Sequence, residues 1–416
     1  MMFLQYAIWG AWLPLLWPFL SDFRGLSGAQ IGNIFAIGAV GAILAPFLAG
    51  QIADRYFATE KFLGVSHILG AGVVWQLAAV QSYGAFLGLS LLYSLIYAPT
   101  LSLTNSLAFH HIPDRDRDFG KIRVWGTVGW IVVGIGIGQW LLRRHTPTGA
   151  EAAEVLLAQA AGMGDAFRLS AVLGLLMGIY CFTLPNTPPA RSEQSNAALR
   201  ALGEVRMQPL LTLFLLAVPI SVIHQFYFVH TAGFLQRFQT EAAEAVNRIF
   251  GVGGGGLMTV GQMSEILVLA AIPFVSRKLS RKAFLAIGIT AYLLRFLIFA
   301  YGDTLGLGAV IAGVALHGLC FGCFIFVAFM IVDEESATDV KASAQSLFNV
   351  VIVGIGTIVG SKVAGWVADW ATMSGGELDY RRLFMVPMWI SAACLIALLL
   401  FYPSRQTATA PLEVRT

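Results

Sequence analysis

Twelve apolar segments, each 19 to 28 residues long, dominate this chain of 416 residues. A helix needs about 20 largely apolar residues to cross a bilayer, and only helices and closed barrels satisfy their backbone hydrogen bonds there. The segments form two sets of six, at 3–22, 30–53, 62–81, 85–108, 122–142 and 167–185, then at 208–235, 256–276, 282–301, 306–332, 344–370 and 383–403. This pattern predicts an all-α integral membrane protein with twelve transmembrane helices in two six-helix bundles.

The composition supports this prediction. Hydrophobic residues make up 57% of the chain and charged residues 12%, whereas soluble proteins carry about 25% charged residues. No single core could bury so much apolar surface, so we expect a lipid bilayer to solvate much of it. The net charge of +3 is small and its basic residues lie mainly in short loops, so no nucleic-acid partner is predicted. The four cysteines all lie in apolar segments, so we expect them to be buried packing residues and predict no metal or cofactor. We also expect a monomer.

The two sets of apolar segments divide the chain into two domains. We predict an N-terminal six-helix bundle at 1–185, a cytoplasmic linker at 186–207, a C-terminal six-helix bundle at 208–403 and a cytoplasmic tail at 404–416. When both termini are placed in the cytoplasm, the inner loops hold more Lys and Arg residues than the outer loops. Because basic residues concentrate in cytoplasmic loops, we expect both termini on that side.

Glu265 lies near the middle of the eighth apolar segment. An ionised carboxylate at the centre of a bilayer costs about 3 kcal/mol or more, so such residues face a polar cavity or a partner. Gln262 lies one helical turn earlier, on the same face. Residues 133–136 (VGIG) also recur at 353–356, and a parallel repeat of this kind places a pocket between the halves near mid-membrane. These features predict a carrier with a polar solute site. We find no nucleophile and base arranged for catalysis, so an enzyme is not predicted.

Residues 50–55 (GQIADR), which are followed by Lys61, lie between the second and third segments. They resemble the loop signature of the major facilitator superfamily, although the later part of the motif differs. Asp54 could cap or pair with a neighbouring helix end while Arg55 stays in the cytoplasm, so we predict a gating loop at Asp54 and Arg55. The alternative is an ordinary charged loop.

A narrower resemblance extends along nearly the whole chain. The segments that resemble the bacterial nucleoside–proton symporter family are 3–12, 97–101, 122–130, 262–265, 294–296, 300–303 and 342–345. The resemblance implies the major facilitator fold and a permease that moves nucleosides across the bacterial inner membrane by alternating access, with protons as a second substrate. It also implies that the nucleoside pocket is lined by Arg123, Thr127, Trp130, Gln225, Phe228, Gln262, Glu265, His317 and Phe321.

The spacing of these nine residues is consistent with a pocket. They fall on four helical faces, namely Arg123 with Thr127 and Trp130, Gln225 with Phe228, Gln262 with Glu265, and His317 with Phe321. Carboxylate, amide and guanidinium groups would bind the ribose hydroxyls. Trp130 or Phe321 would stack on the base, a contact worth about 1–3 kcal/mol in nucleic-acid proteins.

Several of these residues have a structural alternative. The aromatic side chains could face lipid or pack between helices, Gln225 could bridge two helices, and Arg123 could extend to the cytoplasmic surface. Arg295, which lies nearer the middle of its segment, could pair with an acidic residue elsewhere or act directly. Glu265 is the residue least readily explained in this way.

The chain departs from the family at three positions. Gly322 stands where the family has an aspartate implicated in proton coupling, His317 where a tyrosine is usual, and Phe228 where an asparagine is usual. Because glycine cannot take a proton, Glu265 or a histidine would have to carry it instead. The histidine candidates are His317, His224 and His230, of which His317 lies in the predicted pocket.

Other functions remain open at this stage. An uncoupled nucleoside uniporter needs no proton carrier at all. A permease for another hydroxylated solute, such as a sugar, would use the same polar groups. A sensor with the same fold would bind solute without transporting it, but the chain shows no signalling domain.

Overall fold

The computed structural model describes residues 1–48, 57–188, 205–276, 278–337 and 341–403. Ten helical stretches in these ranges are long and apolar enough to cross a membrane. Together with α3 (Gly28–Leu48) and α5 (Thr59–Leu77), they make the twelve transmembrane helices of a major facilitator fold. The fold predicted from the sequence is therefore confirmed. The predicted gating residues Asp54 and Arg55 lie outside the described residues.

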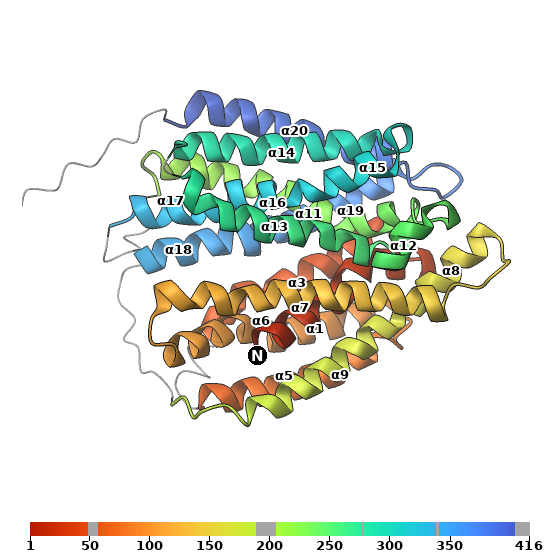
Figure 1. The fold of residues 1–416 in the computed structure, drawn as a ribbon, viewed down its shortest axis with the longest axis horizontal. Coiled ribbons are helices and arrows are strands. Elements are labelled where there is room, and N and C mark those ends of the chain that lie inside the picture. The colour runs from red at the N-terminus through yellow and green to blue at the C-terminus, as the bar shows by residue number, and fades with distance from the viewer. Residues whose placement is uncertain (49–56, 189–204, 277, 338–340, 404–416) are drawn as a thin grey trace, which may run out of the picture.

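The helices of each half pack together as one bundle (Figure 1). The first bundle contains α1 (Met2–Trp12), η1 (Leu13–Leu15), α2 (Leu16–Pro18), η2 (Phe19–Phe23), α3, α5, α6 (Tyr83–His111), α7 (Arg115–Arg144), α8 (Ala152–Gly162) and α9 (Gly164–Cys181). The second contains α11 (Leu210–Gln236), η4 (Glu241–Ala243), α12 (Glu244–Phe250), α13 (Gly255–Val275), α14 (Arg281–Ala300), α15 (Gly302–Ala315), α16 (His317–Leu319), η5 (Cys320–Phe326), α17 (Val327–Glu335), α18 (Lys341–Asn349), η6 (Val350–Ile355), α19 (Gly356–Ala371) and α20 (Tyr380–Phe401). Two spans of the second bundle are interrupted by π-helical turns at η5 and η6.

The sixth span starts earlier than the apolar pattern predicts. Its apolar part was expected at 167–185, but a separate helix, α8, precedes α9 and turns into it at Met163. The α8 sequence, AAEVLLAQAAG, is rich in alanine and leucine, which are strong helix formers. Glu151 and Glu154 give this stretch the charge that is typical of a loop, although charged residues are well tolerated near a helix end.

Two of the places where the halves meet lie toward one end of the molecule, and we call them the first and second seam. This end carries α8 and α12, and we call it the α12 end; the opposite end carries α17 and α18 and is called the α18 end (Figure 1). In the first seam, α3 approaches α19 so closely that a Cβ at Gly28 would overlap the carbonyl oxygen of Gly365. A Cβ at Gly32 would lie 2.6 Å from the carbonyl oxygen of Ser361.

The second seam joins α7 to the segment that contains α12 and α13. A Cβ at Gly138 would lie 2.5 Å from the carbonyl oxygen of Phe250, so only glycine fits there. The backbone N–H of Val252 donates to the carbonyl of Gly138 over 3.1 Å. The amide of Gln139 donates to the carbonyls of Asn247 and Arg248 over 3.2 and 2.9 Å. The α12 end is therefore closed by backbone contacts between the halves.

Candidate functional site

Glu265 lies on α13 with 15% of its side chain exposed. Its Oε2 atom lies 3.6 Å from Nε2 of His317, which is 2% exposed. His317 begins α16, directly before the π-helical turn η5 that breaks the span. Such π-helical turns are frequent at functional sites. The structure thus brings together an acid and a histidine that are far apart in sequence.

An aromatic cluster continues from this pair into the other half. The ring of His317 contacts Phe228 of α11 with centroids 6.0 Å apart, and Phe321 of η5 at 6.4 Å. Phe228 in turn contacts Trp130 of α7 at 6.4 Å with an interplanar angle of 77°. Trp130 stands edge-on to Trp9 of α1 at 5.9 Å. The predicted aromatic residues therefore form one connected group that crosses the boundary between the halves.

Arg123 faces the same region from α7. Its guanidinium carbon lies 4.0 Å above the ring of Tyr6 on α1, and its charge acts on Glu265 across the boundary between the halves. Thr127 lies one turn further along α7, between Arg123 and Trp130, and is half-buried. These positions give the N-terminal half one cation opposite the acid of the C-terminal half.

The two glutamines differ in their hydrogen bonding. Gln225 donates from Nε2 to Oγ of Ser361 over 2.9 Å, so its amide bridges α11 and α19, as the structural alternative expected. Gln262 is buried, and its Oε1 atom has no hydrogen-bond partner among the described residues. A buried acceptor without a donor is costly, so Gln262 is well placed to accept a hydrogen bond from a solute.

A second group of residues, from α11 and α14, lies around His317. Arg295 of α14 is fully buried and places NH2 3.4 Å from Nδ1 of His317. Its guanidinium carbon lies 4.3 Å above the ring of Tyr227 and 5.4 Å from that of Tyr292. The hydroxyl of Tyr292 lies 2.7 Å from Nδ1 of His224. Among the described residues Arg295 forms no ion pair with a carboxylate, so cation–π contacts hold it.

Sequence reasoning missed part of this site. Tyr6 and Trp9 lie one turn apart on the first helix, within a segment used only to recognise the family. Tyr227 stacks on His317 with centroids 4.7 Å apart and was not singled out. The signal for Tyr227 was available, because it directly precedes Phe228 in the same aromatic run.

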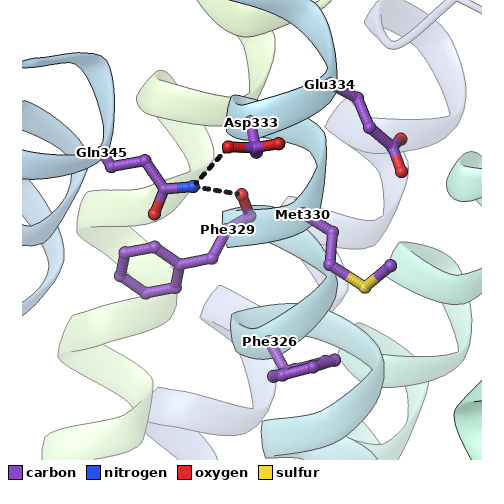
Figure 2. Close-up of a pocket in the computed structure, with 6 residues that line it drawn as sticks. All are labelled: Phe326, Phe329, Met330, Asp333, Glu334 and Gln345. Carbon is purple, nitrogen blue, oxygen red and sulfur yellow. Dashed lines mark hydrogen bonds between the residues drawn. The ribbon is translucent and has the colours of Figure 1, made fainter. Parts of the chain in front are cut away.

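A surface pocket lies apart from these residues, at the α18 end. Figure 2 shows its lining between α17 and α18, where Gln345 donates from Nε2 to the carbonyl of Phe329 over 3.3 Å and to Asp333 over 3.5 Å. None of the nine predicted site residues lines this pocket. Helix-to-helix packing within one half explains its contacts, and we assign it no part in solute binding.

Comparisons with known proteins identify the family. A sequence model described as "Nucleoside H+ symporter" matches residues 1–407. The chain is 30% identical to the putative nucleoside transporter YegT of Escherichia coli K12, over 96% of this chain and 90% of that protein. It is 28% identical to the xanthosine permease of the same organism, over 97% and 94%. The crystal structure of the nucleoside transporter NupG superposes with a TM-score of 0.81, at 26% identity and over 96% of each chain.

Proposed function

Because this chain belongs to the nucleoside H+ symporter family, we propose that it is a proton-coupled nucleoside permease that works by alternating access in a bacterial inner membrane. It is a transporter rather than an enzyme, as its relatives are. The observation that carries the proposal is the connected group of Trp130, Phe228, His317 and Glu265. This group joins an acid to aromatic rings across the boundary between the halves.

The same group suits the two parts of a nucleoside. The carboxylate of Glu265 would accept hydrogen bonds from ribose hydroxyls, and the unpaired Oε1 of Gln262 would accept another. Trp130, Phe228 and Phe321 would offer faces or edges to the base, as aromatic residues do in nucleic-acid proteins. Arg123 and Thr127 would complete the site from α7. Gln225 would contribute only if it released Ser361.

The closed α12 end suggests a direction for the transport cycle. We place the α12 end outside and the α18 end in the cytoplasm, with both termini, the linker 186–207 and the tail 404–416 on the cytoplasmic side. The chain would then be closed to the outside and would have to part the α3–α19 and α7–α13 seams to admit a nucleoside. Asp54 and Arg55 would act as the gating loop at the cytoplasmic side.

Charge across the boundary offers a route for coupling. Arg123 of the N-terminal half and Glu265 of the C-terminal half interact electrostatically. Protonation of Glu265 would remove this attraction, because a neutral carboxyl has no net charge for Arg123 to act on. Uptake of a proton would thereby change the relative stability of the two states of the carrier.

Uptake by the purified full-length protein in liposomes tests the proposal. With the outside made acid, the wild type is expected to concentrate radiolabelled uridine, and unlabelled nucleosides should compete better than sugars. Glu265→Gln is expected to bind uridine more weakly and no longer to accumulate uridine when a pH gradient is imposed. The matched control is Glu377→Gln, which changes an exposed glutamate in a loop at the α12 end. Uptake that sugars block and nucleosides do not would overturn the substrate class.

A further inference from the structure

We propose that Arg295 holds His317 as a neutral hydrogen-bond donor and so leaves Glu265 as the residue that takes up the coupled proton. This inference rests on the proposed function and goes beyond it, because it decides which of two facing residues, His317 or Glu265, takes up the proton. The contact that carries it is the 3.4 Å approach of Arg295 NH2 to Nδ1 of His317.

The chemistry of arginine fixes the direction of this hydrogen bond. A guanidinium group has five N–H donors and no acceptor, so Nδ1 of His317 must accept. A neutral imidazole carries one proton, and this proton must then be on the other ring nitrogen, Nε2. Nε2 is the atom that lies 3.6 Å from Oε2 of Glu265. His317 therefore presents an N–H to the carboxylate while Arg295 occupies its other side.

A second proton on His317 is opposed by the same contact. The added proton would be on Nδ1 and would point at the N–H groups of Arg295, with two positive charges in close contact inside a fully buried cluster. Buried like charges are costly because the interior screens them poorly. Arg295 has little freedom to move away, since its guanidinium lies against the rings of Tyr227 and Tyr292.

Apart from Glu265, which faces Nε2, the described groups around His317 bring no negative charge to offset this repulsion at Nδ1. From α11, His224 and Tyr227 stack on its ring at 5.6 and 4.7 Å, and Nδ1 of His224 is engaged with the hydroxyl of Tyr292. From η5, Cys320 and Phe321 bring no carboxylate. Gly322 brings no titratable group, and a Cβ there would lie 2.7 Å from the side chain of Val268.

Glu265 faces a different set of groups. It has the N–H of His317 on one side and the charge of Arg123 from α7, with Tyr6 of α1 beside that cation. Unlike His317, it is partly exposed, so a proton can reach it. It can give up its proton and remain paired, because a donor and a cation both face it.

Nitrogen-15 NMR of the full-length protein with labelled histidine tests the protonation state directly. The signal of His317 is identified among the seven histidines as the one absent from His317→Gln. In the wild type we expect an unprotonated Nδ1 and a protonated Nε2, unchanged between about pH 5 and pH 8. A signal for doubly protonated His317 within that range would overturn the inference, whatever the protein transports.

Transport by variants tests the assignment of the carrier. Gln at position 317 keeps an N–H donor but cannot take a proton. Because position 317 lies in the proposed site, we expect His317→Gln to bind uridine more weakly, yet an acid-outside gradient should still drive uridine to a higher concentration inside than outside. Glu265→Gln should exchange uridine across the membrane without concentrating it. If His317→Gln exchanges uridine but no longer concentrates it, His317 is the carrier and the inference fails. If the wild type moves no nucleoside, the proposed function fails instead, while the NMR result still stands.

Two substitutions of Arg295 separate positioning from a structural role. Arg295→Lys keeps a group that only donates, so the dependence of uridine exchange on pH should stay that of the wild type. Arg295→Met removes the donor and the charge, so His317 should become able to take a second proton. The rate of uridine exchange should then show a second ionisation in its pH dependence, and this ionisation should be absent from the double variant Arg295→Met/His317→Gln. If Arg295→Met exchanges uridine more slowly than the wild type at every pH but with the same pH dependence, Arg295 merely supports the fold.

Discussion

Asp369 near the end of α19 caps the first turn of α3 in the other half. Its Oδ1 atom accepts a hydrogen bond of 2.6 Å from the backbone N–H of Gly28, and its Oδ2 atom accepts one of 2.8 Å from Ala29. The first N–H groups of a helix have no partner within the helix and carry partial positive charge. A carboxylate of the C-terminal half thus stabilises the α12 end in its closed state.

Asp369→Asn should therefore favour opening of the α12 end. Loss of the carboxylate charge at a helix N-terminus costs about 1 kcal/mol, which corresponds to roughly a fivefold shift toward the open state. Thr259→Cys reports the opening, because Thr259 is fully buried and lies against Gly134 in the α7–α13 seam. A membrane-impermeant maleimide should label this cysteine faster in Asp369→Asn. Equal labelling rates with and without Asp369→Asn would show that the carboxylate does not hold the seam.

The first seam, between α3 and α19, allows a stronger prediction for Gly365→Leu. A Cβ at Gly365 would overlap the carbonyl oxygen of Gly28 and lie 3.0 Å from Cα of Gly32, so a leucine side chain has no space unless α3 and α19 part. We expect a carrier that stays open at the α12 end, binds uridine and does not complete the cycle. Equilibrium binding and uptake in liposomes measure the two effects separately. Gly136→Leu on α7 is the matched control, since nothing lies within 4 Å of a Cβ at that position.

Trp130 should contribute directly to affinity. It is the aromatic residue of α7 that meets Phe228 of the other half, and base stacking is worth about 1–3 kcal/mol. Trp130→Ala is expected to weaken uridine binding by about that amount, as measured by calorimetry. Trp370→Ala removes a tryptophan that is 63% exposed, and its affinity should stay that of the wild type. An unchanged affinity in Trp130→Ala would remove this residue from the site.

The sequence predicted the twelve spans because each helix must be apolar over its membrane-buried length, a requirement that local composition alone reveals. It did not predict α8, where helix propensity continues past the charged edge of the apolar run. Helical spacing placed Trp130 and Phe228 each on a polar or aromatic face, but not in contact, because spacing within one helix says nothing about which helix lies opposite. The contact between Arg295 and His317 depends on how α14 packs beside the break at η5, which no local pattern encodes.

A substitution at Gly322 tests how tightly η5 packs against α13. A Cβ at this position would lie 2.7 Å from Cγ1 of Val268 on α13, and overpacking of this kind costs about 1–3 kcal/mol. Gly322→Ala should therefore lower the thermal unfolding temperature of the detergent-solubilised protein. Adding Val268→Ala removes the obstructing methyl groups, so the double variant should be more stable than the sum of the single effects predicts. If the two effects simply add, the α13 side chain is not what excludes larger residues, and the glycine would have to be explained by the π-helical backbone of η5 itself.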